Sequence, residues 1–339
     1  MKPRALVTFV LSAVLLVSSC ANGGPGDPDG PGGPGQPGQT NPFNGRLIAR
    51  GSGNLHTMNL TTNGEWVKQL PLPVQNAQPY VRSDSNELYV SRLNAANPLI
   101  IDIYDLSTFG KKEHGYVWPG TDNMLRASQL AVAPGGRYLA VLMRGFSDDF
   151  LEIYDTQAEE VVFTGFDGTI GTNLIWTSDL DLIFAMNFQG QGGAEVYGGI
   201  VAVPLAEFLD GDEQFDIKVL HAFNQQQWGT SGVYDLALSH DEKQIAFVRS
   251  GDIWAKDLAT GESPRQLTTG PTGSWGPAFS PDGNHIVFVG AQGLALRDTL
   301  IVNNDSGGPY MVHTGDHSVT EVYILDRRYL VEDILAWLP

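Results

Sequence analysis

The chain has 339 residues, of which 42% are hydrophobic and 17% are charged, so it can form a sizeable core and is not globally disordered. The formal net charge of −18 excludes a nucleic-acid partner, because binding to a duplex needs a basic surface. The single cysteine excludes an intramolecular disulfide and every metal or redox motif that needs two thiols.

Residues 1–19 have the pattern of a signal peptide. Lys2 and Arg4 precede an apolar run, Ala5–Val17, which is shorter than the roughly 20 residues that a membrane span requires. The sole cysteine, Cys20, directly follows two serines, and this arrangement resembles a bacterial lipobox. The resemblance implies that Cys20 is lipidated and anchors the chain to a membrane. Because Ala21 follows it, the same resemblance implies the outer membrane in a Gram-negative host. The alternative is an ordinary secretory signal with an incidental cysteine.

Two further segments follow the signal peptide. Residues 20–44 comprise the lipidated cysteine and a linker so rich in glycine and proline that it has no means of packing. Residues 45–339 are predicted to be all-β, because short runs rich in Val, Ile, Tyr and Phe alternate with Gly, Asn and Asp. The only helical signal is about one turn at Leu205–Leu209.

The β region contains repeats. The most regular unit spans Tyr234–Thr268 and reads as four strands with three turns, and the next unit opens at Gly276 with the tight-turn sequence Ser280-Pro281-Asp282-Gly283. A second marker is an apolar strand that ends on aspartate, as at Asp105, Asp155 and Asp257. These units resemble the WD40-like (PD40) repeats of the TolB family of periplasmic β-propellers. The resemblance covers residues 45–339 and implies a propeller that binds other molecules rather than one that catalyses a reaction.

The two ends of the β region complete each other. Asp333–Pro339 looks like the opening strand of a unit, and Gly45–His56 looks like a unit without its opening strand. Pairing these ends would leave no open sheet edge. The predicted fold is therefore an all-β, six-bladed β-propeller closed by pairing of the C-terminal strand with the N-terminal blade. The predicted opening strands contain Tyr80, Ala131, Ile175, Ala237, Phe279 and Ala336.

Two long insertions are the candidates for a binding face. Asn187–Gly199 and Ala291–Thr320 are both expected between the second and third strands of their blades, and therefore on one face of the ring. Loops on a rigid scaffold often carry function. The alternative is that both insertions are neutral. The candidate binding residues combine aromatic and polar side chains, as binding surfaces do: Phe188, Tyr197, Tyr310, His313, Asp316 and His317.

Chemical motifs are scarce. The chain has no GxSxG, HExxH or Walker A sequence, so we predict no catalytic residues and no cofactor. His313, Asp316 and His317 are the donor types of a metal site, but polar neighbours in such a loop are more often solvated. Asn303–Gly308 has oxygen ligands for calcium but lacks the alternating acidic positions and the distal glutamate of a known calcium loop. The expected function is a non-catalytic lipoprotein that binds an envelope protein or a glycan. The alternative is a propeller enzyme, such as a lactonase or lyase, with a metal in its central channel.

Overall fold

The computed structural model describes residues 44–51, 54–60, 65–71, 78–82, 84–94, 97–112, 115–117, 126–144, 149–166, 170, 173–189, 196–210, 215–223, 232–268, 273–290, 308–313, 319–321 and 333–339. The predicted signal peptide, Cys20 and residues 21–43 of the linker lie outside these ranges. Within the described ranges, no helix has the length and hydropathy needed to cross a membrane.

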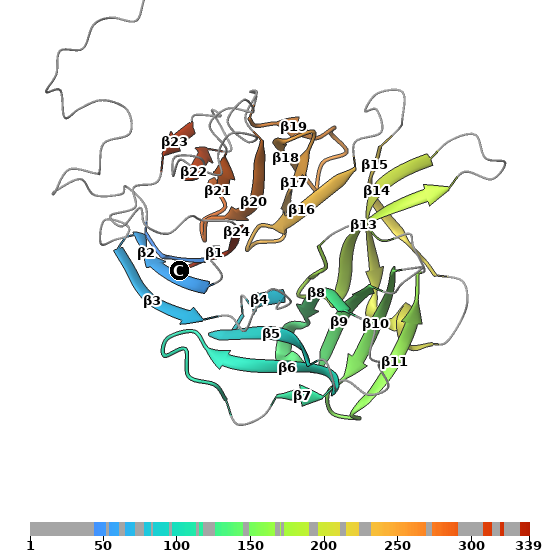
Figure 1. The fold of residues 1–339 in the computed structure, drawn as a ribbon. Helices are drawn as coiled ribbons and strands as arrows, with labels where there is room; N and C mark the ends of the chain where they lie inside the picture. The colour runs from blue at the N-terminus through green and yellow to red at the C-terminus, as the bar shows by residue number, and fades with distance from the viewer. Residues whose placement is uncertain are drawn as a thin grey trace, which may run out of the picture.

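The strands form six four-stranded antiparallel sheets (Figure 1). Sheet 1 contains β24 (Asp333–Leu338), β1 (Arg46–Gly51), β2 (Asn54–Asn59) and β3 (Glu65–Pro71). Sheet 2 contains β4 (Gln78–Arg82), β5 (Glu87–Asn94), β6 (Asn97–Asp105) and β7 (Tyr116–Val117). Sheet 3 contains β8 (Arg126–Val132), β9 (Tyr138–Arg144), β10 (Asp149–Asp155) and β11 (Glu160–Gly165).

The second half of the chain forms three further sheets. Sheet 4 contains β12 (Ile175–Trp176), β13 (Asp181–Gln189), β14 (Val196–Pro204) and β15 (Lys218–Phe223). Sheet 5 contains β16 (Val233–Leu238), β17 (Gln244–Arg249), β18 (Asp252–Asp257) and β19 (Arg265–Gln266). Sheet 6 contains β20 (Ser274–Phe279), β21 (His285–Gly290), β22 (Gly308–His313) and β23 (Val319–Glu321). Five sheets are each formed by four consecutive strands, and sheet 1 combines the two ends of the β region.

The sheets stand around a central cavity as the blades of a β-propeller (Figure 1). The innermost strand of each sheet lines the cavity, and these strands are β24, β4, β8, β12, β16 and β20. Apolar side chains from neighbouring sheets pack between them. Trp176, for example, lies in a buried cluster shared by sheets 3 and 4, and Trp337 lies in one shared by sheets 1 and 6. Both tryptophans therefore belong to the core between blades.

The pairing of β1 with β24 joins the two ends of the β region. Arg46 lies opposite Leu338, and Arg50 lies opposite Asp333, with a bulge between Ile48 and Ala49. The indole nitrogen of Trp337 donates a hydrogen bond to the Asn44 carbonyl oxygen at 2.9 Å.

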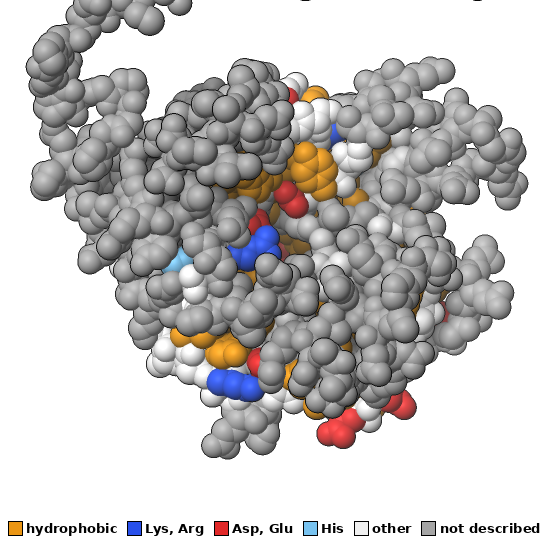
Figure 2. Space-filling view, in the orientation of Figure 1, with side chains coloured by type: hydrophobic (Ala, Val, Ile, Leu, Met, Phe, Trp, Pro, Cys, Tyr) orange, Lys and Arg blue, Asp and Glu red, His pale blue; other side chains and the backbone are white. Residues whose placement is uncertain are grey.

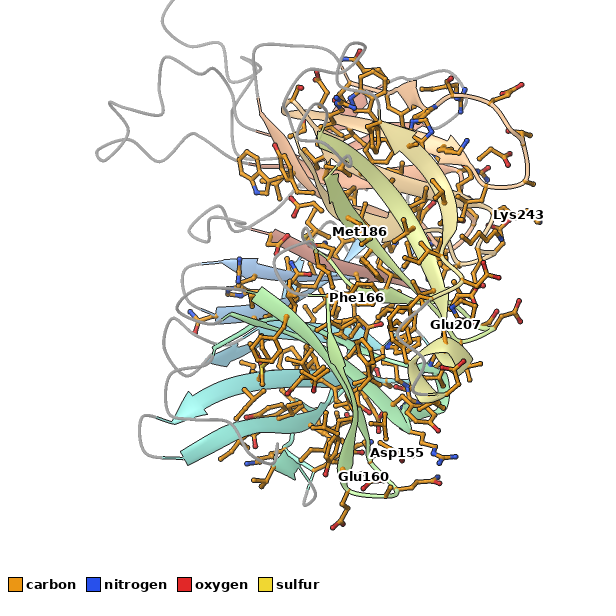
Figure 3. All side chains as sticks on the ribbon, turned by 90° about the vertical axis from the view of Figure 1, so that its right-hand side faces the viewer. Asp155, Glu160, Phe166, Met186, Glu207 and Lys243 are labelled. Carbon is orange, nitrogen blue, oxygen red and sulfur yellow. The ribbon has the colours of Figure 1, made fainter. Side chains whose placement is uncertain are left out.

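The propeller has two faces that differ in their loops. One face carries the short turns between the first and second strands, such as 177–180, 239–243 and 280–284, and we call it the turn face. It also carries the loops between third and fourth strands, so Glu160, Glu207 and Lys243 lie on the same side of the molecule (Figure 3). At the opposite face, which we call the connection face, the second strands end and the third strands begin, as β13 does at Gln189 and β14 at Val196.

The structure confirms the helical turn predicted at Leu205–Leu209, which is helix α1, and adds a 3-10 turn, η2 (Pro134–Gly136). Helix α1 covers one end of sheet 4, where Phe208 packs on Phe163 and Phe215 with ring centroids 4.9 and 5.8 Å apart.

Both predicted insertions are shorter than expected. Strands β13 and β14 continue to Gln189 and from Val196, so their hairpin connection spans only 190–195. Likewise, the predicted insertion Ala291–Thr320 contains β22 and the start of β23, which leaves 291–307 as the connection.

Candidate functional site

The central cavity is the candidate site. Its volume is about 830 Å³, and side chains from the inner strands of all six sheets line it. Figure 2 looks onto the connection face, where basic and acidic side chains meet in a central hollow. Large concave pockets with a few polar groups are the usual ligand sites of proteins.

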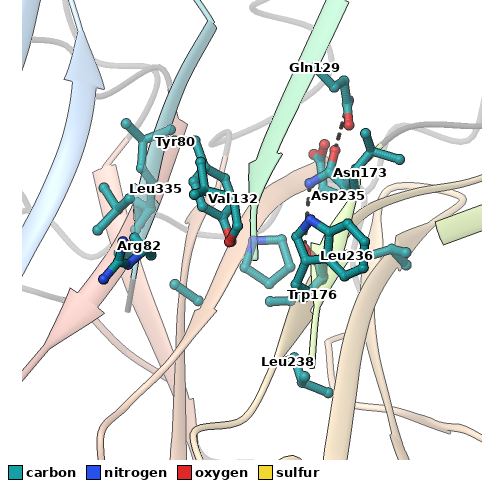
Figure 4. A pocket seen from close by; sticks show the side chains of 18 of the residues that line it. Tyr80, Arg82, Gln129, Val132, Asn173, Trp176, Asp235, Leu236, Leu238 and Leu335 are labelled. Carbon is teal, nitrogen blue, oxygen red and sulfur yellow. Dashed lines mark hydrogen bonds between the residues drawn. The ribbon is translucent and has the colours of Figure 1, made fainter. Parts of the chain in front are cut away.

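One wall of the cavity carries a chain of two side-chain hydrogen bonds, which we call the polar relay (Figure 4). The Gln129 amide nitrogen donates to Asn173 Oδ1 at 3.1 Å, and Asn173 Nδ2 donates to the Leu236 carbonyl oxygen at 3.4 Å. Asn173 has a φ of 68°, a left-handed conformation that asparagine tolerates better than most residues. The relay therefore connects sheets 3 and 5 across the chain that enters β12.

Asp235 lies beside this relay. Its Oδ2 accepts a hydrogen bond from the Gly276 N–H at 3.2 Å. Burial raises the pKa of the Asp235 carboxyl, although the Gly276 N–H and the charge of Arg50 act in the opposite direction. Arg50 itself forms an ion pair with Asp333 at 3.7 Å. All four residues line the cavity at the end nearer the connection face.

Bulges in the inner strands explain how Asp235 reaches the cavity. The register between β16 and β17 shifts between Tyr234 and Ala237, and the register between β20 and β21 shifts at the corresponding place between Trp275 and Ala278. Asp235 has a φ of 52°, and Gly276 at the equivalent position has a φ of 59°. An aspartate in this region carries roughly 1–3 kcal/mol of backbone strain, which a glycine avoids.

Gly276 is also required by its surroundings. A Cβ atom at this position would lie 2.5 Å from Asp333 Oδ1. The glycine therefore permits the close approach of β20 and β24 at this end of the cavity.

Ion pairs and turns border the other end of the cavity, at the turn face. Arg82 forms an ion pair with Glu87 at 3.1 Å and contacts Asp84, whose Oδ2 accepts the Gly135 N–H of sheet 3 at 3.2 Å. The Arg82 pKa is raised: burial is the largest single effect and lowers it, but the hydrogen bonds that Arg82 donates to Asp84 and Tyr89, together with the charges of these residues, outweigh burial.

A second carboxylate joins sheets 4 and 5 at the same end. Glu242 accepts hydrogen bonds from the Ser178 backbone nitrogen at 2.6 Å and from the Ser178 hydroxyl at 2.9 Å. Carboxylates thus connect neighbouring blades at two places around this mouth.

The structure separates the residues that the sequence analysis grouped as a binding face. Phe188 and Tyr197 are cross-strand partners near the connection face. Tyr310 lies in β22 opposite Phe288. His313 is at the far end of β22, opposite His285, and hence at the turn face. The side chains of these residues, and Asp316 and His317 altogether, lie outside the described parts of the structure.

The cavity residues were missed because no sequence pattern marks them. At Asp235 a bulge breaks the alternation that tells inward from outward side chains, and Asn173 precedes β12 and so lies outside any strand pattern. The available signal was that Asp235 and Gly276 occupy the same position in consecutive repeats. An aspartate at a position that suits glycine could have marked Asp235 as a candidate site residue. Among the described residues, no three His, Cys, Asp or Glu side chains gather as metal ligands.

Comparisons with known proteins bear on the fold. No family model matches the chain, and no curated protein matches its sequence. Among solved structures, TolB from Acinetobacter baumannii is similar, with a TM-score of 0.58 and 18% identity over 87% of this chain and 66% of that one. The chain thus spans slightly less than two thirds of that TolB.

Other solved structures are similar as well. A putative TolB from Agrobacterium tumefaciens has a TM-score of 0.53 and 14% identity over 82% of this chain and 89% of that one. A nidogen/laminin complex has a TM-score of 0.55 and 10% identity over 86% and 97%. At such low identities the likeness concerns the fold alone, and the chain is therefore a β-propeller with a fold similar to that of TolB.

Proposed function

We propose that the chain is a membrane-anchored bacterial lipoprotein whose propeller serves as a protein- or glycan-binding platform at the cell envelope and catalyses no reaction. The central cavity of about 830 Å³ is the observation that carries this proposal. Its wall combines hydrogen-bonding groups, such as Gln129 and Asn173, with apolar ones, such as Val81 and Leu335. The TolB-like fold supports a binding role by analogy only.

A pulldown from solubilised envelopes tests the platform. The full chain serves as bait beside two variants in which residues 190–195 or 291–307 are replaced by a tight Asn-Gly turn. We expect unchanged melting and weaker capture of a shared prey by either variant, because the strands that flank both connections end or begin at the connection face. Undiminished capture by both variants would show that the recognition surface lies elsewhere. A stoichiometric metal in the purified protein would instead favour the enzyme alternative.

Fractionation tests the anchor. Acyl chains contribute about 0.8 kcal/mol per buried CH₂, so several chains on Cys20 hold a protein stably on a membrane. Cys20→Ala should move the protein from the membrane fraction to the soluble fraction or leave it unprocessed. An unchanged distribution of the variant would rule out lipid anchoring through this residue.

A further inference from the structure

An Asn–Gly pair joins the linker to the propeller. Asn44, the last linker residue, is exposed, and Gly45 directly precedes β1 at the turn face. A glycine has no side chain to shield its backbone nitrogen, so this nitrogen can attack the side-chain amide of a preceding asparagine. The pair is therefore a candidate for deamidation, a covalent modification that consumes only water.

The fold requires the glycine of this pair. Gly45 has a φ of 102°, and a Cβ atom at this position would lie 2.8 Å from Trp337 Nε1 and closer still to the Leu338 carbonyl oxygen. A larger residue would therefore collide with β24, the strand that closes the propeller. The reactive glycine cannot be replaced without disturbing the pairing of β1 with β24.

The peptide group between Asn44 and Gly45 is also a contact of the closed propeller. Its carbonyl oxygen, that of Asn44, accepts the Trp337 indole N–H at 2.9 Å. The next carbonyl, that of Gly45, accepts the Leu60 N–H at 2.9 Å. Trp337 is only 3% exposed, so the loss of its acceptor would cost stability. One peptide group thus supplies both the attacking nitrogen and the acceptor for the closing strand.

The two groups that would react are available. No described residue forms a hydrogen bond with the Asn44 side-chain amide or with the Gly45 N–H. The exposed Asn44 side chain can therefore rotate towards the Gly45 nitrogen. The hydrogen bond from Trp337, in contrast, fixes the orientation of the peptide group, so the attack requires that this bond opens.

We propose that Asn44 is a deamidation site whose reaction is coupled to the closure of the propeller. The Gly45 nitrogen gives its proton to hydroxide and forms a bond with Asn44 Cγ, and the Cγ–Nδ2 bond breaks with release of ammonia. The product is a five-membered succinimide. One water then opens it, which leaves aspartate or isoaspartate at position 44.

The isoaspartate form changes the closing contact. Its main chain runs through the former side chain and is one methylene longer. The carbonyl that accepted the Trp337 N–H becomes part of a free carboxylate outside the main chain. Modified chains should therefore close less firmly, and they present the substrate of an isoaspartate carboxyl methyltransferase.

Ageing of the purified full chain in mildly alkaline buffer tests the inference. Mass spectrometry of proteolytic fragments locates isoaspartate and measures its rate of formation. We expect it to accumulate at position 44, and faster at higher pH, because hydroxide removes the proton from the attacking nitrogen. Asn44→Gln should abolish the reaction at this position, since glutamine would have to form a six-membered ring, which closes far more slowly.

Matched variants test the coupling to closure. Trp337→Phe removes the indole N–H and should speed the reaction at Asn44 several-fold. Trp275→Phe, the same change in the same apolar cluster, keeps the hydrogen bond to Asn44 and should leave the rate unchanged. Asn22 and Asn63, each also followed by glycine, are internal references that reveal any general loosening of the chain.

Melting curves measure the effect in the reverse direction. The aged full chain should melt at a lower temperature than the fresh one, and Asn44→Gln aged in parallel should lose less. An Asn44 that stays intact while Asn22 and Asn63 react would overturn the inference. Equal rates in Trp337→Phe and Trp275→Phe, or equal losses of melting temperature with and without Asn44, would also overturn it. None of these results depends on lipidation or on partner binding.

Discussion

At the scale of single residues, aspartate has two different roles in this propeller. Asp105, Asp155 and Asp257 end the third strands of their sheets, and each accepts hydrogen bonds from the backbone nitrogens two and three residues ahead. These contacts fix the turn that follows, which explains why the repeat ends on aspartate. Hydrogen bonds from Arg137 further lower the pKa of Asp155. Asp235, in contrast, lies in the cavity wall, where burial raises its pKa.

The raised pKa of Asp235 predicts a stability penalty at neutral pH. Because the folded chain binds this proton more tightly than the unfolded chain, stability falls as pH rises from the ordinary value of 3.8 through the raised pKa. Asp235→Asn should therefore raise the urea midpoint at pH 7. The asparagine can still accept the Gly276 N–H and tolerates the positive φ. The gain should vanish at pH values below 3.8, and a variant less stable than wild type at pH 7 would contradict this account.

At the scale of elements, the turns between first and second strands share one design. The Ser280 hydroxyl donates to Asp282 Oδ1 at 2.5 Å and accepts the His285 N–H at 2.9 Å, and Ser239 makes the corresponding contacts in sheet 5. Gly283 has a φ of 72° in the first turn, and Glu242 has a φ of 58° at the same place in the second. Glu242 adopts this strained conformation, and its carboxylate accepts two hydrogen bonds from Ser178 of the neighbouring sheet.

Substitutions of Glu242 separate its strain from its contact with Ser178. Glu242→Ala removes both hydrogen bonds and keeps the strain, so it should lower the free energy of unfolding by about 1–2 kcal/mol. Glu242→Gly should lose less, because glycine adopts the positive φ freely. Glu160→Ala, at an exposed position on the same face, is the control and should change little. Equal losses for alanine and glycine, measured in urea titrations, would show that strain is irrelevant here.

At the scale of the whole molecule, one strand joins the two ends of the β region. Strand β24 buries Ile334, Trp337 and Leu338, each at most 6% exposed. Ile334 and Trp337 pack with sheet 6, and Leu338 packs with sheet 2. Leu335 is only partly buried and lines the cavity.

Deletion of Asp333–Pro339 should leave the protein unfolded at ordinary temperatures, so that it shows no cooperative unfolding transition. Burial of each such side chain contributes about 1.5–3 kcal/mol, and the sum approaches the 5–15 kcal/mol of a typical domain. Calorimetry of the truncated and full-length proteins measures the loss. A truncated protein as heat-stable as the full chain would show that the pairing of β1 with β24 is dispensable.

The sequence predicted the parts of this fold that repeat. Tyr80, Ala131, Ile175, Ala237, Phe279 and Ala336, which it assigned to opening strands, all lie in the cavity-lining strands. It failed where the repeat is locally interrupted. Strand β22 was read as part of an insertion, so His313 was placed on the wrong face. The bulge at Asp235 turned a side chain into the cavity that strict alternation would have placed elsewhere.

The position of β1 has a mechanical consequence. Arg46, the first residue of β1 and two positions after the linker, lies at the turn face, and β1 runs from there into the molecule between β24 and β2. A pull on the linker acts along the axis of β1, and it loads the hydrogen bonds of both ladders together instead of opening them one after another. If a partner bound on the connection face and an anchor at Cys20 are drawn apart, the tension therefore acts in shear on the sheet that joins the two ends of the propeller.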